Sequence, residues 1–388
     1  MGPTRTGEEP GKHVQYGGHY LLAAVEYVKS FFAQNHLQNA YLIACQHILP
    51  STHLMIRSMI SLGLDRSRIA LIGKCYSTNQ TVMENMINEG IFVCRSSIEF
   101  DSEQSFDQQF QNSVNFFFQA QIHRMKPNKN AKIIILDDGG VLISAAQQII
   151  ERYPNICGVE QTSSGYHKLA KLPLNFPVVN VAQSAAKLNF ESPLIAKSII
   201  YNLERKLNLS SATPKSILLI GNGAVGTALQ QALKTQYTHH KTTTYDIIKE
   251  RSGVTYYPDF SHFDLIIGAT GSKMINLNYY SSLKKGAVLA SISSSDREFD
   301  AVNFRKLSGK KWDTHDDVLC DHLCLLNCGF PLNFSGENNV SIPLKQIQLV
   351  CALLFLGVCE SVDYNILHRK FVELNNGYVI DLLNKFSI

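Results

Sequence analysis

The stretch Ser216-Ile-Leu-Leu-Ile-Gly-Asn-Gly-Ala-Val-Gly226 decides the fold of this chain. Its first half, 216–220, is a continuous apolar run that predicts one buried strand of a parallel sheet. The glycines that follow have the spacing G-x-G-x-x-G, and a helical pattern begins directly after them. Strand, glycine turn and helix in this order are typical of a dinucleotide-binding site. The alternative is a doubly wound domain in which the glycines form only a turn.

Each glycine of this turn has its own physical reason. Gly221 permits the tight turn, Gly223 lets backbone amides approach a pyrophosphate, and Gly226 lets the helix pack close to the strand. The helix N-terminus, with Ala224 and Val225, is expected to face the phosphates because its free amides attract anions.

A second strand-like run ends at Asp246, twenty residues beyond the last glycine. A carboxylate at this place binds the adenosine ribose hydroxyls and repels a 2′-phosphate. We therefore predict NAD rather than NADP as the cofactor. We interpret the neighbouring Lys249 and Arg251 as solvated loop residues.

Length and composition set the class of protein. A chain of 388 residues with 45% apolar and 18% charged residues is long enough for two globular domains with large cores. The net charge of +4 without a basic block gives no electrostatic reason for a nucleic-acid or membrane partner. We expect a cytoplasmic protein with a disordered leader over residues 1–13. Its nine cysteines are interpreted as reduced thiols, and without a C-x-x-C pair they predict no metal site.

Strand-like runs alternate with helical patterns along the chain, which predicts an α/β fold. We expect two doubly wound parallel-sheet domains, a Rossmann NAD domain and a flavodoxin-like substrate domain, with a cleft between them. Residues 14–190 plus 337–388 are assigned to the substrate domain, and 191–336 to the NAD domain. Hinges near 190 and 336 would let the cleft close. The other predicted strands are 40–45, 69–72, 91–94, 132–136, 158–159, 178–181, 264–267, 287–291 and 323–326, and the predicted helices are 14–34, 51–62, 78–88, 105–125, 141–152, 192–208 and 342–361.

Four polar clusters follow predicted strands, where catalytic groups lie in open α/β sheets. Taken singly, each has a structural interpretation: His47 as a surface histidine, Asp138 as a helix N-cap and Lys187 as a solvated lysine. The clusters are 45–47, 137–140, 160–165 and 180–187.

Together, the order and local sequence of these clusters resemble S-adenosylhomocysteine hydrolase (adenosylhomocysteinase). The resemblance extends from about residue 39 to about residue 356. It implies an NAD-dependent enzyme that acts on a nucleoside or thioether by transient oxidation of a hydroxyl, elimination or hydration, and reduction. It also implies a homo-oligomer, a dimer or a tetramer. The segments that carry it are 135–140, 158–169, 177–187, 221–226 and 267–271.

The same resemblance implies roles for individual residues. Lys187 would manage the proton at the 3′-hydroxyl, while Asp138 and His47 would serve the C4′ hydrogen and the 5′ leaving group. Glu191 stands where the family has an aspartate near its lysine. Gln161 and Asn327 are the implied substrate contacts. The implied cofactor contacts outside the glycine turn are Thr162, Ser163, Ser164, Thr270, Gly271 and Asn327.

Departures from the family pattern fall in the substrate half. Gln161 replaces a ribose-binding glutamate, Ser294 replaces a histidine, and the family's Gly-His-Pro after 327–329 is missing. They favour a substrate other than, or besides, adenosylhomocysteine. Two alternatives stay open: a catalytically silent NAD-binding homologue that regulates a partner protein, and an NAD(P) dehydrogenase that releases its cofactor at each turnover.

Overall fold

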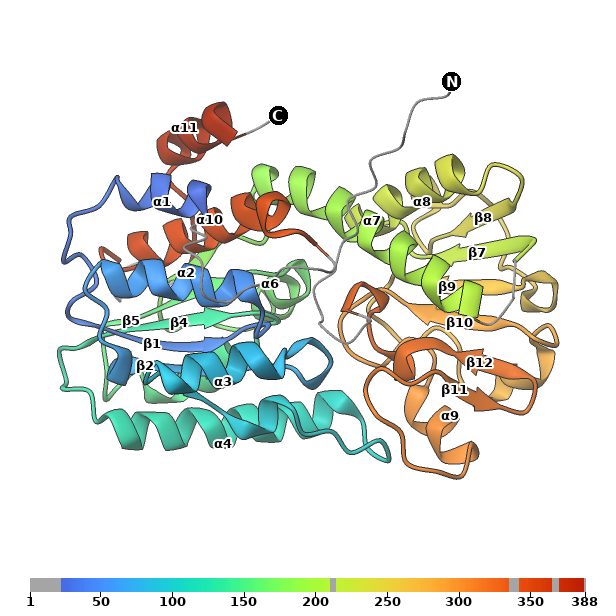
Figure 1. Cartoon of the computed structure of the whole chain (residues 1–388), viewed down its shortest axis with the longest axis horizontal. Coiled ribbons are helices and arrows are strands. Elements are labelled where there is room, and N and C mark those ends of the chain that lie inside the picture. The colour runs from blue at the N-terminus through green and yellow to red at the C-terminus, as the bar shows by residue number, and fades with distance from the viewer. Residues whose placement is uncertain (1–21, 210–213, 335–341, 365–369, 387–388) are drawn as a thin grey trace, which may run out of the picture.

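The chain forms two lobes that lie side by side, with helix α7 (Ala185–Leu209) crossing from one to the other (Figure 1). The computed structural model describes residues 22–209, 214–334, 342–364 and 370–386. The predicted leader over 1–13 and the predicted hinge at 336 lie outside these residues.

The first lobe is built on a sheet of seven parallel strands in the order β13-β6-β5-β4-β1-β2-β3. From β3 to β6 this is the 3-2-1-4-5-6 order of a Rossmann fold. The strands are β1 (Ala40–Cys45), β2 (Ile69–Ile72), β3 (Phe92–Val93), β4 (Lys132–Asp137), β5 (Ile156–Glu160), β6 (Val178–Asn180) and β13 (Phe371–Glu373).

The second lobe holds six strands in the order β11-β12-β10-β9-β7-β8, of which β11 runs antiparallel to β12. When only the parallel strands of this lobe are numbered, leaving out β11, β8 to β12 follow the order 2-1-3-4-5, which is flavodoxin-like. The two doubly wound sheets are confirmed, but the flavodoxin-like order lies in the lobe with the glycine turn. The strands are β7 (Ser216–Ile220), β8 (Lys241–Tyr245), β9 (Leu265–Gly268), β10 (Val288–Ser291), β11 (Val318–Cys320) and β12 (Leu323–Leu325).

Helices cover both faces of each sheet because successive strand residues point to opposite sides. In β1, Leu42 and Ala44 join the core under α2 and α10, whereas Ile43 and Cys45 join the core under α4. The remaining helices are α1 (Ala23–Lys29), α2 (Pro50–Ser61), α3 (Gln80–Asn88), α4 (Phe106–Met125), α5 (Val141–Ala146), α6 (Ser163–Leu169), α8 (Ala224–Gln236), α9 (Ala301–Leu307), α10 (Leu344–Glu360) and α11 (Asn376–Phe386).

The end of the chain returns to the first lobe. Helix α10 packs against α1, α2 and α7, and β13 extends the first sheet beside β6. Near the predicted hinge at residue 190, α7 is one continuous helix that contains Pro193. The helix continues on both sides of this proline, although proline has no N–H to donate to the preceding turn.

Short elements account for most differences from the predicted pattern. The helix predicted over 141–152 ends at Ala146, and α7 begins seven residues before the predicted 192. Helices α6 and α9 and strand β11 have seven residues or fewer, too few for an apolar period to stand out. They are held by contacts with distant parts of the chain rather than by local pattern.

A buried arginine joins the two lobes. Arg305 of α9 donates from Nε to the carbonyl of Ser102 at 2.7 Å, and from Nη2 to the carbonyl of Gln104 at 3.1 Å and to Oδ2 of Asp296 at 2.8 Å. Ser102 and Gln104 belong to the first lobe, while Asp296 belongs to the second. Asp296 in turn accepts a bond from the amide of Phe106, at the start of α4. The guanidinium is 1% exposed, so each of these bonds is shielded from water.

Aromatic rings continue this junction. Tyr76 of the first lobe stacks on Phe330 of the second at 4.9 Å between ring centroids, and Phe106 meets Phe330 edge-on at 5.4 Å. One hydrophobic cluster therefore runs from the first sheet to the second. The lobes share a core on this side of the cleft.

Replacing Arg305 with methionine should lower the free energy of unfolding by about 3–5 kcal/mol, because it leaves the buried carboxylate of Asp296 without its counter-charge. Unfolding of the full chain in guanidinium chloride measures this change in free energy. Arg57→Met, which breaks the exposed pair with Glu89, is the control and should cost about 1 kcal/mol or less. Equal effects of the two variants would contradict the structural role of Arg305.

Candidate functional site

A cavity of about 1090 Å³ lies between the lobes and is lined by both of them. Most of the predicted site residues face it, whereas Gly221, Asp246 and Asn327 do not. The predicted residues on its wall are His47, Asp138, Gln161, Thr162, Ser163, Ser164, Lys187, Glu191, Gly223, Ala224, Val225, Gly226, Thr270 and Gly271.

The glycines of the turn differ in what a side chain would meet. Gly221 has φ +99°, and a Cβ there would lie 2.7 Å from the carbonyl of Ala269. A Cβ on Gly226 would lie 2.2 Å from the carbonyl oxygen of Gly221. Gly223 is different, since its Cβ would meet nothing within 4 Å and the residue lines the cavity. The fold needs Gly221 and Gly226, while Gly223 leaves space beside the N-terminus of α8.

Asp246 ties the glycine turn to the loop after β8. Its Oδ2 accepts a bond from the amide of Asn222 at 2.7 Å, and its Oδ1 accepts one from the amide of Ile248 at 2.8 Å. The side chain of Asn222 also donates to the carbonyl of Arg251 at 2.7 Å. Arg251, interpreted from sequence as a solvated loop residue, is exposed and also lines the cavity.

A buried glutamate that the sequence pattern did not reveal shapes the loop after β9. Oε1 of Glu298 accepts bonds from the amides of Thr270 at 2.5 Å and Gly271 at 3.0 Å, and Oε2 accepts one from Ser291 at 2.9 Å. Burial raises the pKa of Glu298 above its ordinary value. A Cβ on Gly268 would lie 2.6 Å from this carboxylate, so a glycine ending β9 was the one local signal.

Glu160 does the same work in the first lobe. Its Oε1 accepts bonds from the amide of Gly139 at 3.1 Å and from the amide and hydroxyl of Thr162, each at 2.8 Å. The Thr162 hydroxyl also caps α6 by accepting a bond from the amide of Gly165. Thr162 lies on the cavity wall, but its hydroxyl is already engaged within the protein. Ser163 accepts a bond from Gln183 at 3.1 Å.

Lys187 and Glu191 form an ion pair on one face of α7, with 2.7 Å between Nζ and Oε2. Lys187 is buried and Glu191 is partly exposed, and both line the cavity. The spacing of four residues places the two groups one helical turn apart. The structure therefore brings together these two predicted residues.

His47 and Asp138 also meet, and they bring two residues that the sequence analysis missed. Nε2 of His47 lies 3.2 Å from Oδ2 of Asp138, and Nδ1 lies 2.5 Å from the hydroxyl of Ser77. The other oxygen of Asp138 pairs with the ammonium of Lys74. Burial alone would raise the pKa of Asp138, but Lys74 and His47 hold it well below its ordinary range. A lysine two residues beyond the buried strand β2 was the available signal for this pair.

Two glutamines leave unpaired polar atoms in the cavity wall. Nε2 of Gln46 and Oε1 of Gln161 are buried and find no hydrogen-bond partner among the residues that the structure describes. Buried polar atoms without a partner cost about 1–3 kcal/mol, so a ligand that completes their bonds gains affinity. The pair offers one donor and one acceptor without charge.

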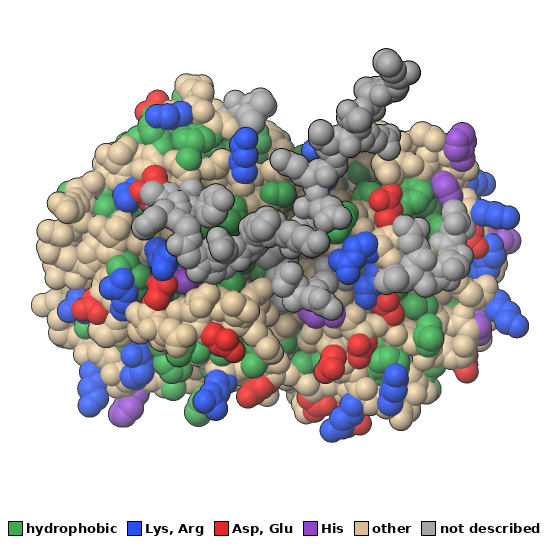
Figure 2. Space-filling model, in the orientation of Figure 1, with side chains coloured by type: hydrophobic (Ala, Val, Ile, Leu, Met, Phe, Trp, Pro, Cys, Tyr) green, Lys and Arg blue, Asp and Glu red, His purple; other side chains and the backbone are tan. Residues whose placement is uncertain are grey.

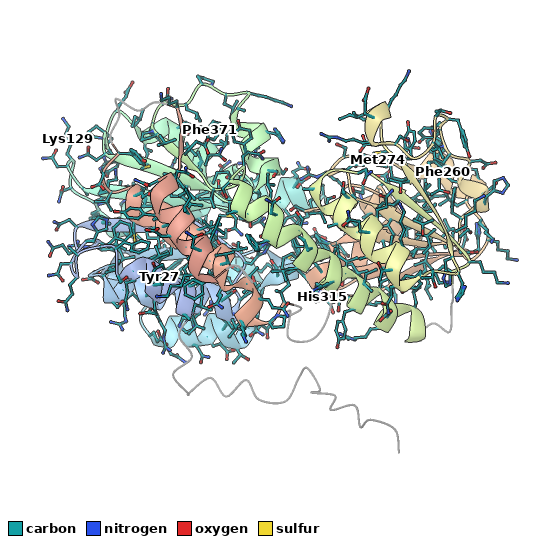
Figure 3. The ribbon with its side chains drawn as sticks, turned by 90° about the horizontal axis from the view of Figure 1, so that it is seen from above. Tyr27, Lys129, Phe260, Met274, His315 and Phe371 are labelled. Atoms are coloured by element: carbon teal, nitrogen blue, oxygen red, sulfur yellow. The ribbon has the colours of Figure 1, made fainter. Side chains whose placement is uncertain are left out.

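Asn327 lies outside the cavity. Its backbone is left-handed, with φ +53°, and its side-chain Nδ2 donates to the carbonyl of Pro331 at 3.2 Å. Its side-chain oxygen lies 3.2 Å from Nδ1 of His315, which sits beside the distal part of α7 (Figure 3). The structure gives Asn327 a role in holding the chain after β12. Ser294, where the related family has a histidine, does line the cavity.

Charge is spread without a dominant sign: basic and acidic side chains are interspersed on the face in Figure 2. Within the described ranges, no helix is long and apolar enough to cross a membrane. In the same part of the chain, no group of three or more His, Cys, Asp or Glu side chains could hold a metal ion.

The fold and the cavity define a two-lobed α/β protein with a dinucleotide-type glycine turn. No family model matches the chain. It is 37% identical over 356 residues to uncharacterized protein MT0113 and to uncharacterized protein Rv0104, from two strains of Mycobacterium tuberculosis. These matches cover 89% of this chain and 69% of each relative. The chain belongs to the same family as these two mycobacterial proteins.

Three solved structures that match the chain share little sequence with it, and their TM-scores lie below 0.5. A cofactor (NAD+)-bound 3-phosphoglycerate dehydrogenase of Entamoeba histolytica has a TM-score of 0.41 at 11% identity, covering 86% of this chain and 100% of that chain. A 2-hydroxyacid dehydrogenase of Ketogulonicigenium vulgare has a TM-score of 0.38 at 10% identity, covering 81% and 93%. The A chain of dipicolinate synthase from Bacillus subtilis has a TM-score of 0.36 at 13% identity, covering 75% of this chain and 88% of that chain.

Gly223→Val should remove a bound dinucleotide while leaving the fold intact, because a Cβ at this position meets no protein atom within 4 Å and the side chain would occupy the space that the phosphates need. Mass spectrometry of small molecules released on denaturation measures retention. Gly226→Ala is the contrast, since its Cβ clashes with backbone and should cost about 1–3 kcal/mol of stability. Full retention of a dinucleotide by the valine variant would refute the assignment of the turn.

Asp137 and Glu160 should make stability depend on pH. Burial raises the pKa of both carboxyl groups, so the folded chain binds their protons more tightly than the unfolded chain does. Their contribution to stability is complete below the ordinary carboxyl pKa and is lost as the pH rises through the raised values. Glu160→Gln should therefore flatten the fall in unfolding free energy between the ordinary and the raised carboxyl pKa values, as urea titrations at several pH values would show. Glu151→Gln, at an exposed position, is the control and should leave the pH dependence of the unfolding free energy as in the wild type. If Glu160→Gln shows this same pH dependence, the prediction is wrong.

Proposed function

We propose that the cavity binds NAD and a neutral, nucleoside-like substrate, and that the protein transfers a hydride between the substrate's hydroxyl-bearing carbon and the nicotinamide. The observation that carries this proposal is the placement of an ion-paired lysine and a glycine turn on the wall of one cavity. Lys187 with Glu191 comes from α7, and Gly223 comes from the second lobe.

The second lobe fits the adenine dinucleotide. The space beside Gly223 is open, and α8 is a helix of 13 residues whose free N-terminal amides would attract the phosphates. Asp246 directly follows β8 and, although it does not line the cavity, it fixes the glycine turn through the amide of Asn222. Thr270 and Gly271, fixed by Glu298, would line the nicotinamide side. When bound, the nicotinamide accepts or donates a hydride.

Lys187 would hold the proton of the reacting hydroxyl. During oxidation, the amine takes the hydroxyl proton after its own proton has moved to Glu191, 2.7 Å away. During reduction, the same path runs backwards. Burial of Lys187 in the wall keeps its amine oriented, and the partial exposure of Glu191 gives the proton a route to solvent.

The part of the cavity wall around Asp138 is polar and its charges are paired, while Lys168 and Lys171 line the cavity as exposed cations. Lys74 pairs with Asp138, and Gln46 and Gln161 present one donor and one acceptor. Such a wall suits a neutral ligand with several hydroxyl groups. This agrees with the resemblance to adenosylhomocysteinase, which stays a prediction, and it supports a nucleoside or thioether as the substrate class.

A second candidate is a catalytically silent NAD-binding homologue that regulates a partner protein. It is favoured by the bonds that His47 and Asp138 make within the protein, which leave the elimination and hydration steps without an evident proton carrier. The retained pair of Lys187 and Glu191 favours the enzyme, because regulation by bound NAD needs no proton carrier at a hydroxyl.

Adding a panel of nucleosides to the purified chain loaded with NAD should raise the absorbance of the NADH band. Lys187→Met should keep NAD bound but abolish this change, because the hydroxyl proton has no acceptor. The control is Lys197→Met, an exposed lysine on the same helix. If the absorbance change is the same in Lys187→Met as in the wild type, Lys187 has no part in the reaction. If no nucleoside changes the absorbance of the wild type, the catalytically silent homologue is favoured.

A further inference from the structure

Four side chains at the substrate end of the cavity form one continuous chain of contacts. The ammonium of Lys74 pairs with Oδ1 of Asp138, Oδ2 of Asp138 lies 3.2 Å from Nε2 of His47, and Nδ1 of His47 lies 2.5 Å from the hydroxyl of Ser77. Lys74, Asp138 and Ser77 are at most 4% exposed. Only His47 and Asp138 reach the cavity wall.

This chain occupies both nitrogens of the imidazole. The ionised carboxylate of Asp138 can only accept a bond, so Nε2 of His47 must carry the proton between them. With a single ring proton on Nε2, Nδ1 accepts the proton of the Ser77 hydroxyl. The ring of Phe334, from the second lobe, covers His47 at 4.4 Å between centroids. Neither nitrogen is left to face a ligand.

Asp138 is equally committed. A carboxylate serves as a base for a carbon-bound hydrogen when its environment raises its affinity for a proton. Here a buried ammonium and an imidazole N–H favour the charged form, and the pKa of Asp138 falls well below its ordinary range. A carboxylate in this state orients its partners and accepts no proton near neutral pH.

We propose that Lys74 is a positioning residue that keeps Asp138 and His47 out of proton transfer, so that the reaction in this cavity ends with hydride transfer at the hydroxyl-bearing carbon. This inference rests on the proposed function, because it concerns the carbon next to the one that is oxidised.

The balance of the reaction shows what Lys74 prevents. Oxidation breaks the C–H and O–H bonds of the alcohol, gives the hydride to NAD⁺ and the proton to Lys187, and leaves a ketone. The ketone acidifies the hydrogen on the adjacent carbon, and elimination of a neighbouring leaving group would need a base to remove that hydrogen. With Asp138 and His47 bound to one another and to Lys74, the hydrogen stays, and reduction returns the alcohol unchanged.

The first test needs no turnover. In ¹⁵N NMR spectra of the purified chain near neutral pH, His47 should carry one ring proton, on Nε2. In Lys74→Met, the buried Asp138 has lost its cation, so His47 should take up a second proton and show both nitrogens protonated. Lys129→Met, at the outer edge of the first lobe (Figure 3), is the control and should match the wild type.

The second test follows the substrate. The wild-type chain loaded with NAD is incubated with adenosine in D₂O, and both the NADH band and the deuterium content of the recovered adenosine are measured. We expect the band to appear with no deuterium at the carbon next to the oxidised one beyond the level in buffer alone. A positioned base would raise this exchange by about 10²–10⁴-fold.

The outcomes separate the inference from the proposed function. An NADH band with deuterium uptake above that of the buffer overturns the inference and leaves the proposed function standing. Absence of the band overturns the proposed function, and the NMR spectra then decide the role of Lys74. A wild-type His47 protonated on Nδ1, or identical His47 spectra in the wild type and Lys74→Met, would show that Lys74 does not govern the pair. If Lys74→Met fails to fold, the position of the proton in the wild type decides the point.

Discussion

The buried guanidinium of Arg305 is the contact on which the two-lobed arrangement depends. It binds carbonyls of the first lobe and a carboxylate of the second, at a point where the rings of Phe100 and Phe330 exclude water. Arginine suits this place because its planar fork satisfies several acceptors at once and stays charged. With the lobes joined on this side, the opposite side forms the cavity, and the distance across it is set by the fold.

Each lobe orients its side of the cavity with a buried glutamate. Glu160 holds the loops after β4 and β5, and Glu298 holds the loop after β9 together with Ser291 at the end of β10. A carboxylate with two oxygens can bind several amides, so it fixes loops that lack a ladder of their own. The residues that face the ligand thus gain their positions from groups that do not touch it. This arrangement is typical of preorganised sites.

The sequence predicted the strands and the glycine turn well because both depend on local pattern. The apolar run Ser216–Ile220 was enough to predict a strand. Gly221 and Gly226 were predictable because a Cβ at either position would meet backbone atoms of the turn or of the neighbouring loop. The ion pair of Lys74 with Asp138 joins residues 64 positions apart, so no local spacing announces it. Asn327, predicted as a substrate and cofactor contact, does not line the cavity; its backbone is left-handed, with φ +53°, and its side chain bonds within the protein.

The shared hydrophobic cluster has a consequence for how this chain folds and evolves. One of the three apolar clusters contains residues from both sheets, so each half buries part of its apolar surface against the other, and the two are expected to melt in a single cooperative transition. Replacing the second lobe with that of another protein would expose the apolar residues of this cluster where the two lobes meet. The architecture resembles two domains, but the shared cluster ties the two lobes together in folding and in evolution.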